Sequence, residues 1–236
     1  MSEIVVLSGG AAAGVVKGIQ TDFESKHHCK INGTFSAVGA MRDLVVQGAQ
    51  CDLVILSKSL IDELVKSGHV HADSVRSLGI VPTGIAIPSK RTTPPPSILS
   101  TDELKEVFRS APALYFPDME KSTAGIHFMK VMRQLGLDQE LASRFKTFPN
   151  GATAMAQMAL DPNSDVIGGT QTTEINICPG VQLIGLLPQS VELNTDYTLA
   201  ICKASQNPEL TLKLANVLVG QESLAIRQHI GYLINA

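Results

Sequence analysis

The sequence predicts an α/β protein made of two α/β units. Short apolar runs of strand length alternate with amphipathic segments of helix length through the first third of the chain. A proline-rich segment interrupts this alternation, and a second series of strands and helices follows it. The chain of 236 residues is long enough for one large domain or two small ones.

The first unit begins with a strand at Ile4–Leu7, whose four apolar residues are typical of a strand buried on both faces. Val15, Ile19 and Phe23 then recur at a spacing of four, which places them on one face of a helix. Residues 31–35 read as the second strand.

The alternation continues with a helix through Met41 and Val45 that ends at Gly48, and with a third strand at residues 53–56. Ser59 is expected to cap the next helix, which Gly68 ends. This strand–helix order predicts a parallel sheet with right-handed crossovers.

The second unit starts after a strand at residues 80–87. Pro94–Pro96 force an extended loop, and Ser100 with Glu103 forms a capping box at the start of a helix. Further strands are expected at residues 113–116, 165–167 and 181–184, and further helices at 122–136, 137–145 and 150–160.

The chain then returns to the first unit through a strand at residues 198–201. Asn207 and Pro208 suit the cap and the first position of a helix, and a last helix is expected at 221–229. The first unit therefore comprises roughly residues 1–80 and the C-terminal helices.

Composition excludes some classes of partner. The net charge is −3 and the pI about 6.1, so no overall electrostatic attraction to nucleic acid is expected. No window approaches the ~18 uninterrupted apolar residues that would span a bilayer, so no membrane insertion is expected.

The N-terminus and the cysteines indicate the cellular location to expect for the protein. Met1-Ser2-Glu3 runs directly into the first strand without a basic or apolar leader, so the chain as it stands is expected to be cytoplasmic, and periplasmic if a signal has been removed. The four cysteines contain no CxxC pair and are expected to be mostly buried free thiols.

The turn LSGGAAAG after the first strand resembles a nucleotide-binding loop only in its glycines. Gly9 and Gly14 have the P-loop spacing, but Val15 and Val16 stand where lysine and a hydroxyl residue are required. The dinucleotide fingerprint is also absent, because the glycines at 9 and 10 are adjacent.

The turn has the features of a more general anion site. Ser8 offers a hydroxyl, and the helix N-terminus that follows presents free N–H donors and partial positive charge. The same combination recurs in FSAVGAM with Ser36, in KSTAGIHF with Ser122, and in NGATAM. Two such turns in each unit predict a small-anion site in a cleft between the units.

At this point the chain resembles the type II periplasmic solute-binding proteins, and within them the molybdate-binding group. The resemblance rests on the strand–Ser-Gly–helix segment at 4–24, on TFSAVGAMRDLVVQGAQCDLVILSKSLIDELVKSG, on STAGIHF, on CPGVQLIGLLP and on the segment at 207–231.

The resemblance implies two lobes, each a mostly parallel sheet flanked by helices, joined by two hinge strands. Lobe 1 would comprise residues 1–82 and 196–236, and lobe 2 residues 83–195, with hinges near 81–86 and 189–198. A small anion would bind between lobes that close on it, and a transporter would be a partner if the protein is exported. The ligand-binding residues it implies are Ser8, Gly9, Ser36, Ala37, Ser122, Thr123, Gly151, Thr153, Thr170 and Gln171.

One departure changes the expected ligand. Where the molybdate binders usually supply a tyrosine, this chain has IGGTQTTEI, with Thr170 and Gln171. That pattern looks more like a branch that includes aconitate isomerase, so a small carboxylate is an alternative to an oxyanion.

The alternative function is therefore a cofactor-independent allylic isomerase of an unsaturated di- or tricarboxylate. Such a reaction needs an acid/base group within hydrogen-bond reach of the substrate, for which His127 and Lys58 are the candidates; Glu174 is expected to be a helix or surface carboxylate. No metal site is expected, because His69 and His71 in GHVHAD lack a third ligand.

Overall fold

The computed structural model describes residues 2–234, and its contacts divide the chain into two compact units. Unit 1 comprises residues up to Val81 together with those from Thr195, and unit 2 comprises Pro82–Asn194. The chain passes between the units in two strands, β4 (Arg76–Pro88) and β9 (Asn194–Ile201).

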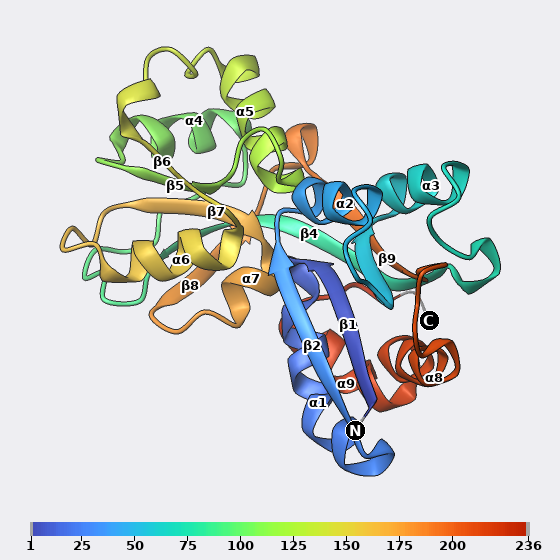
Figure 1. Cartoon of the computed structure of the whole chain (residues 1–236). Coiled ribbons are helices and arrows are strands. Elements are labelled where there is room, and N and C mark those ends of the chain that lie inside the picture. Colours follow the sequence, from blue (N-terminus) through green and yellow to red (C-terminus); the bar gives the residue numbers. More distant parts are fainter. Residues whose placement is uncertain (1, 235–236) are drawn as a thin grey trace. The chain divides into compact units, whose positions relative to one another are not determined.

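Unit 1 contains a sheet with the strand order β2-β1-β3-β9 (Figure 1). Strands β1 (Ser2–Gly9), β2 (Cys29–Ser36) and β3 (Leu53–Ser57) are parallel, and β9 runs antiparallel to β3. All five residues of β3 are buried, as its apolar composition predicts. The expected parallel arrangement of the first three strands is confirmed.

Helices cover both faces of this sheet. Helices α1 (Ala13–His27), α8 (Pro208–Val219) and α9 (Leu224–Ile230) pack together, and α2 (Val38–Val46) packs with α3 (Lys58–Lys66). Short 3-10 turns lie at Gly10–Ala12, Ala72–Ser74 and Gln221–Ser223.

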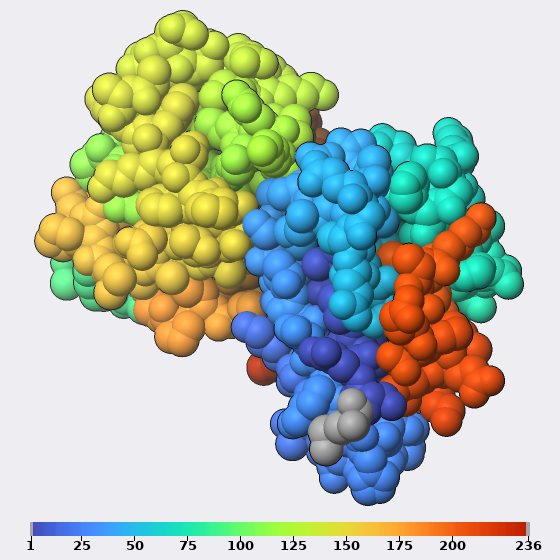
Figure 2. All heavy atoms as spheres, in the orientation of Figure 1, coloured from blue at the N-terminus to red at the C-terminus, as the bar shows by residue number. Residues whose placement is uncertain are grey.

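The C-terminal segment completes unit 1 beside its N-terminal strand. The Asn207 side chain donates to the carbonyl of Glu3 at 2.9 Å, and Figure 2 shows the orange-red returning segment against the dark blue start of the chain. Pro208 is the first residue of α8, as expected.

Unit 2 contains the strand order β4-β7-β5-β6, with β8 (Val181–Leu186) on the other side of β4. Strands β5 (Leu114–Pro117), β6 (Phe145–Phe148) and β7 (Ile167–Gln171) are parallel to one another, whereas β4 runs antiparallel to β7.

Two hydrophobic clusters cover the two faces of this second sheet. Helices α4 (Thr101–Ser110) and α5 (Thr123–Leu135) supply Phe108 and Phe128 to one cluster, and α6 (Gly151–Leu160) supplies Met155 and Met158 to the other. Helix α7 (Thr172–Asn176) adds Ile175 on the side of α6, and Figure 1 shows α5 and α6 on opposite faces.

Several local expectations are confirmed. Ser100 and Glu103 form the capping box of α4, Ser122 caps α5, and Gly136 ends α5 in the left-handed conformation. Gly48 and Gly68 also have positive φ angles just after α2 and α3.

Three local expectations are wrong. The cap residue of α3 is Ser57, because β3 continues to that residue and the helix starts at Lys58 instead of after Ser59. The segment expected to be a helix at 137–145 contains only the 3-10 turn Ala142–Arg144 before β6, and the strand expected at 165–167 lies two residues later, as β7.

None of the helices in residues 2–234 combines the length and apolar character that a membrane crossing requires.

Candidate functional site

In each unit, the three parallel strands bring their carboxyl ends to one edge of the sheet. In unit 1 the register pairs Gly9 of β1 with Ser36 of β2, and β3 ends at Ser57 beside them. Helices α2 and α3 begin immediately after β2 and β3. The predicted residues Ser8, Gly9, Ser36 and Ala37 therefore share one edge, which we call edge 1.

At edge 1, the hydroxyl of Ser8 is buried and donates to the carbonyl of Gly9 at 2.9 Å. Ser36 is half-buried, and Ala37 occupies the cap position of α2. Because Ala37 has no side-chain oxygen, it leaves the first amides of α2 without a side-chain cap. These are the groups that could bind an anion at this edge.

Gly9 has a structural reason to lack a side chain. A Cβ atom at this position would lie 2.6 Å from Val38 Cγ1 and 3.0 Å from the ring of Tyr197, which is too close for either contact. The small size of this residue therefore reflects packing of α2 and β9 against β1, whether or not a ligand approaches here.

Lys58 lies at the start of α3 and points into solvent. Its ammonium group binds the Asp62 carboxylate at 2.7 and 2.9 Å, and its side chain is 56% exposed. An exposed, ion-paired lysine of this kind is the usual surface arrangement on a helix. The geometry gives no support to an acid/base role for it.

In unit 2, the carboxyl ends of β5, β6 and β7 form the corresponding edge, which we call edge 2. Helices α5, α6 and α7 begin there, so Ser122, Thr123, Gly151 and Thr153 lie at the same edge as Thr170 and Gln171. Ser122 and Thr123 are half-buried, and the Ser122 hydroxyl accepts a long hydrogen bond of 3.5 Å from the amide of Gly125.

The first amides of α6 are already bound by side chains of unit 2. Asn150 Oδ1 accepts from the amide of Thr153 at 2.8 Å. Glu174 Oε1 accepts from the amide of Ala152 at 3.3 Å, and the amide of Gly151 also donates to this carboxylate. The helix terminus that the sequence suggested for a ligand thus holds an internal carboxylate.

Glu174 is the residue at edge 2 whose importance the sequence did not reveal. It belongs to α7, its side chain is buried, and burial raises its pKa above the ordinary value despite hydrogen bonds from Thr170 and two backbone amides that lower it. Of the two expectations, a helix or a surface carboxylate, the helix is confirmed and the surface position is wrong, because α7 packs on the face of the sheet that α6 covers.

Two further buried hydroxyls near this edge, those of Thr83 and Thr173, have no hydrogen-bond partner among residues 2–234. Thr83 lies opposite Gln171 in the register of β4 and β7, so it reaches the same edge. A signal for it existed in the sequence, because Thr83 is the single hydroxyl residue in the apolar run at 80–87.

His127 lies in the first turn of α5 and is hydrogen-bonded. Its Nε2 is 2.7 Å from the carbonyl oxygen of Val191, so Nε2 carries the hydrogen and only Nδ1 is left to accept a proton. His127 is half-buried.

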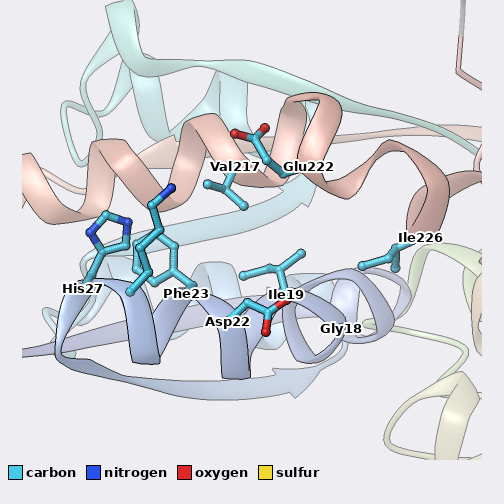
Figure 3. A pocket seen from close by; sticks show the side chains of 9 residues that line it. Gly18, Ile19, Asp22, Phe23, His27, Val217, Glu222 and Ile226 are labelled. Carbon is cyan, nitrogen blue, oxygen red and sulfur yellow. The ribbon is translucent and has the colours of Figure 1, made fainter.

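A cavity of about 190 Å³ lies elsewhere in unit 1, between α1 and the C-terminal helices (Figure 3). Apolar side chains of α1 and the C-terminal helices line it, and Asp22 and Glu222 bring carboxylates to it; the apolar side chains are Ile19, Phe23, Val217 and Ile226. It lies along the second half of α1, and none of the residues predicted to bind a ligand lines it. Among the described residues, no group of three or more histidine, cysteine or acidic side chains could hold a metal ion.

The chain is similar in sequence to known proteins over almost its whole length. The sequence profile described as bacterial extracellular solute-binding protein matches residues 4–233. An aconitate isomerase from Pseudomonas sp. is 24% identical over 231 residues, covering 94% of this chain and 84% of that protein.

Solved structures of binding proteins share the fold. The periplasmic molybdate-binding protein of Azotobacter vinelandii superposes with a TM-score of 0.80 at 14% identity, covering 99% of this chain and all of the other. A sulfate-binding protein of Mycobacterium tuberculosis gives a TM-score of 0.75 at 15% identity, covering 98% and 86% of the two chains.

Proposed function

Because this chain belongs to the bacterial extracellular solute-binding protein family, we propose that it binds a small anion, either an oxyanion or a small carboxylate, through neutral donors at edges 1 and 2. The observation that carries the proposal is the convergence of three parallel strand ends and the helices after them at one edge of each sheet. Ligands of open α/β sheets bind outside the carboxyl ends of the strands.

The chemistry of these edges supports an anionic ligand. Edge 1 offers the Ser36 hydroxyl and the uncapped amides of α2, and the Ser8 hydroxyl would donate to a ligand in place of the Gly9 carbonyl. Edge 2 offers the Ser122 and Thr123 hydroxyls at the start of α5. It also offers Gln171 and, opposite it, the Thr83 hydroxyl, which has no partner in the described part of the chain. Hydroxyls and helix N-termini bind anions without a counter-cation, since they supply hydrogen bonds and partial positive charge.

A thermal-shift screen tests the proposal. Molybdate, tungstate, sulfate and a panel of di- and tricarboxylates would be added at increasing concentration, because a ligand that binds only the folded state raises Tm by mass action. A Tm that no member of this panel raises would contradict the proposal.

Variants of the two edges then locate the site. Ser36→Ala and Ser122→Ala should each weaken binding of the same ligand, by about 1 kcal/mol or more for a lost hydrogen bond to a charged group. Ser67→Ala and Ser110→Ala are matched controls, because these hydroxyls bind carbonyls at the C-terminal ends of α3 and α4. Equal affinity in all four variants would place the ligand elsewhere.

A second candidate function is isomerisation of an unsaturated di- or tricarboxylate without a cofactor. The similarity to an aconitate isomerase favours it, and the buried Glu174 beside Thr170 adds a carboxyl group able to exchange a proton at edge 2. An absorbance assay of cis- and trans-aconitate interconversion separates the two candidates. Tight binding of aconitate without turnover would leave only the binding function.

If turnover is found, variants assign the acid/base group. His127→Ala, Lys58→Ala and Glu174→Gln would be compared, and the geometry leads us to expect the smallest effect for Lys58, whose ammonium group pairs with Asp62 in solvent.

For an exported form of the protein, we expect a periplasmic location and a membrane transporter that receives the ligand.

A further inference from the structure

Two of the four cysteines are neighbours in unit 1. The register of β3 and β9 pairs Leu53 with Ile201, and the amide of Cys202 donates to the carbonyl of Asp52 at 2.9 Å. Cys51 therefore lies one residue from the position opposite Cys202. The Cys51 thiol donates to the carbonyl of Leu53 at 3.3 Å, the Cys202 thiol lies close enough to interact with it, and each residue is only 2% exposed.

This placement suits a covalent bond between the two sulfur atoms. Directly opposite residues in an antiparallel pair have Cα atoms about 4.5–5.5 Å apart, and one step of about 3.4 Å along a strand puts residues that are offset by one position about 6 Å apart. Disulfides usually join residues whose Cα atoms are about 4.4–6.8 Å apart. Cys51 precedes β3, which begins at Leu53, so the alternation of side chains along the strand does not turn its thiol away from Cys202. We propose that Cys51 and Cys202 form a disulfide when the chain folds under oxidising conditions, and that they remain two free thiols under reducing conditions.

The reaction requires an external disulfide, such as oxidised glutathione, as the oxidant. The thiolate of one cysteine attacks a sulfur of that disulfide, which forms a mixed disulfide and releases one glutathione thiol. The second cysteine thiolate attacks the protein sulfur of the mixed disulfide and releases the second glutathione. The two protons lost by the cysteines are taken up by the two glutathione thiolates.

The bond is expected to form during folding. In the folded protein, contact with the Cys51 thiol and burial both raise the pKa of the Cys202 thiol, so the reactive thiolate is disfavoured. In the unfolded chain both sulfurs are exposed to the oxidant, and pairing of β9 with β3 then brings them together.

The proposed bond would join parts of unit 1 that are far apart in the chain. The loop between Cys51 and Cys202 contains all of unit 2, and a cross-link over a long loop restricts the unfolded chain strongly. Asp52 already joins the same two segments, since its carboxylate accepts from the Ser205 hydroxyl at 2.7 Å and from the amide of Gln206 at 2.8 Å. A disulfide here would reinforce an existing connection.

The other two cysteines provide controls. Cys29 begins β2, which β1 separates from β3, and Cys178 follows α7 in unit 2. Variants Cys29→Ser and Cys178→Ser should therefore still form the proposed bond.

The experiment is oxidative refolding of the full chain. Protein unfolded and reduced in guanidinium is refolded in a mixture of reduced and oxidised glutathione, and native folding is verified by circular dichroism. Free thiols are counted in denaturant with Ellman's reagent, and the linkage is mapped by mass spectrometry of non-reduced peptides. We expect two of the four thiols to disappear, a peptide linking Cys51 to Cys202, and a Tm that falls when a reductant is added.

Variants Cys51→Ser and Cys202→Ser should keep all three remaining thiols and show no change of Tm with reductant. Native refolded wild-type protein with four free thiols, or with a different linkage, would overturn the proposal. Since the linkage is mapped in the wild-type chain, the result stands even if a serine variant fails to fold. It is also independent of whether the protein binds an anion.

Discussion

The Thr170 hydroxyl donates a hydrogen bond of 2.6 Å to the Glu174 carboxylate, and both side chains are buried in unit 2. The same carboxylate accepts from the first amides of α6. This connection attaches the start of α6 to β7 and α7, and it fixes the position of one of the predicted ligand-binding residues.

Replacement of Glu174 by glutamine should change how stability depends on pH. Burial raises the pKa of Glu174 in the folded state, so folding favours the protonated form. The stability that this preference contributes is fully present below the ordinary pKa of the carboxyl group and is lost as pH rises through the folded-state pKa. Glu174→Gln, which is neutral at every pH, should therefore gain in Tm relative to the wild type as pH rises above the ordinary pKa of the carboxyl group.

Thermal unfolding followed by circular dichroism measures this effect, with Glu103→Gln as the control. Hydrogen bonds from Ser97 and from Ser100 lower the pKa of Glu103, so its contribution is present above the ordinary pKa and is lost as pH falls. That variant should have a Tm below that of the wild type by a constant amount above the ordinary pKa, and the difference should shrink only as pH falls below it. Parallel pH curves for Glu174→Gln and the wild type would contradict a raised pKa at Glu174.

Asp52→Ala should destabilise unit 1 strongly. The Asp52 carboxylate is buried and accepts from the amides of Val5 and Gln206, both at 2.8 Å, and from the Ser205 hydroxyl. Removing it leaves buried donors without acceptors, and we expect a loss of about 3 kcal/mol in the free energy of unfolding.

Urea unfolding provides the measurement, and Asp62→Ala is the matched control. Asp62 also accepts a charged hydrogen bond, but its pair with Lys58 is exposed and should contribute less than about 1 kcal/mol. Equal losses in the two variants would show that Asp52 does not hold the returning segment.

Gly151→Ala should also be destabilising, because no space exists for a side chain. A Cβ atom there would collide with the Thr170 hydroxyl and the Glu174 carboxylate. Overpacking of this kind costs about 1–3 kcal/mol. Gly18→Ala is the comparison, since its Cβ would approach the Ile226 side chain only to 3.1 and 3.2 Å and alanine favours a helix. A Gly151→Ala variant as stable as Gly18→Ala would refute the close contact.

Lys58→Ala should leave ligand binding unchanged within about a factor of two, because its ammonium group is paired with Asp62 in solvent. Calorimetric titration with a ligand found in the thermal-shift screen measures the affinity. A tenfold or larger loss of affinity, equivalent to about 1.4 kcal/mol, would show that Lys58 contributes to ligand binding.

Local signals in the sequence were sufficient for much of the fold. Buried strands such as β3 are continuous apolar runs, and helices such as α4 begin at a capping box, so both leave a mark within a few residues. Strand β6 was missed because its four residues are partly or fully exposed and form no apolar run. The turn at 142–144 was overestimated as a helix, since Leu137 and Leu141 are buried at a helical spacing without a continuous helix.

The sequence by itself determined the parallel α/β order and which strand ends carry hydroxyl and glycine residues, because both follow from short-range pattern. Only the tertiary structure decided what those residues contact. Gly9 is small because Val38 and Tyr197 occupy the space beside it, and Gly151 because Glu174 does. The burial of Glu174 and the contact of Cys51 with Cys202 depend on segments that are remote in the chain, and a local pattern cannot record which remote side chains will fill a position or remove it from water.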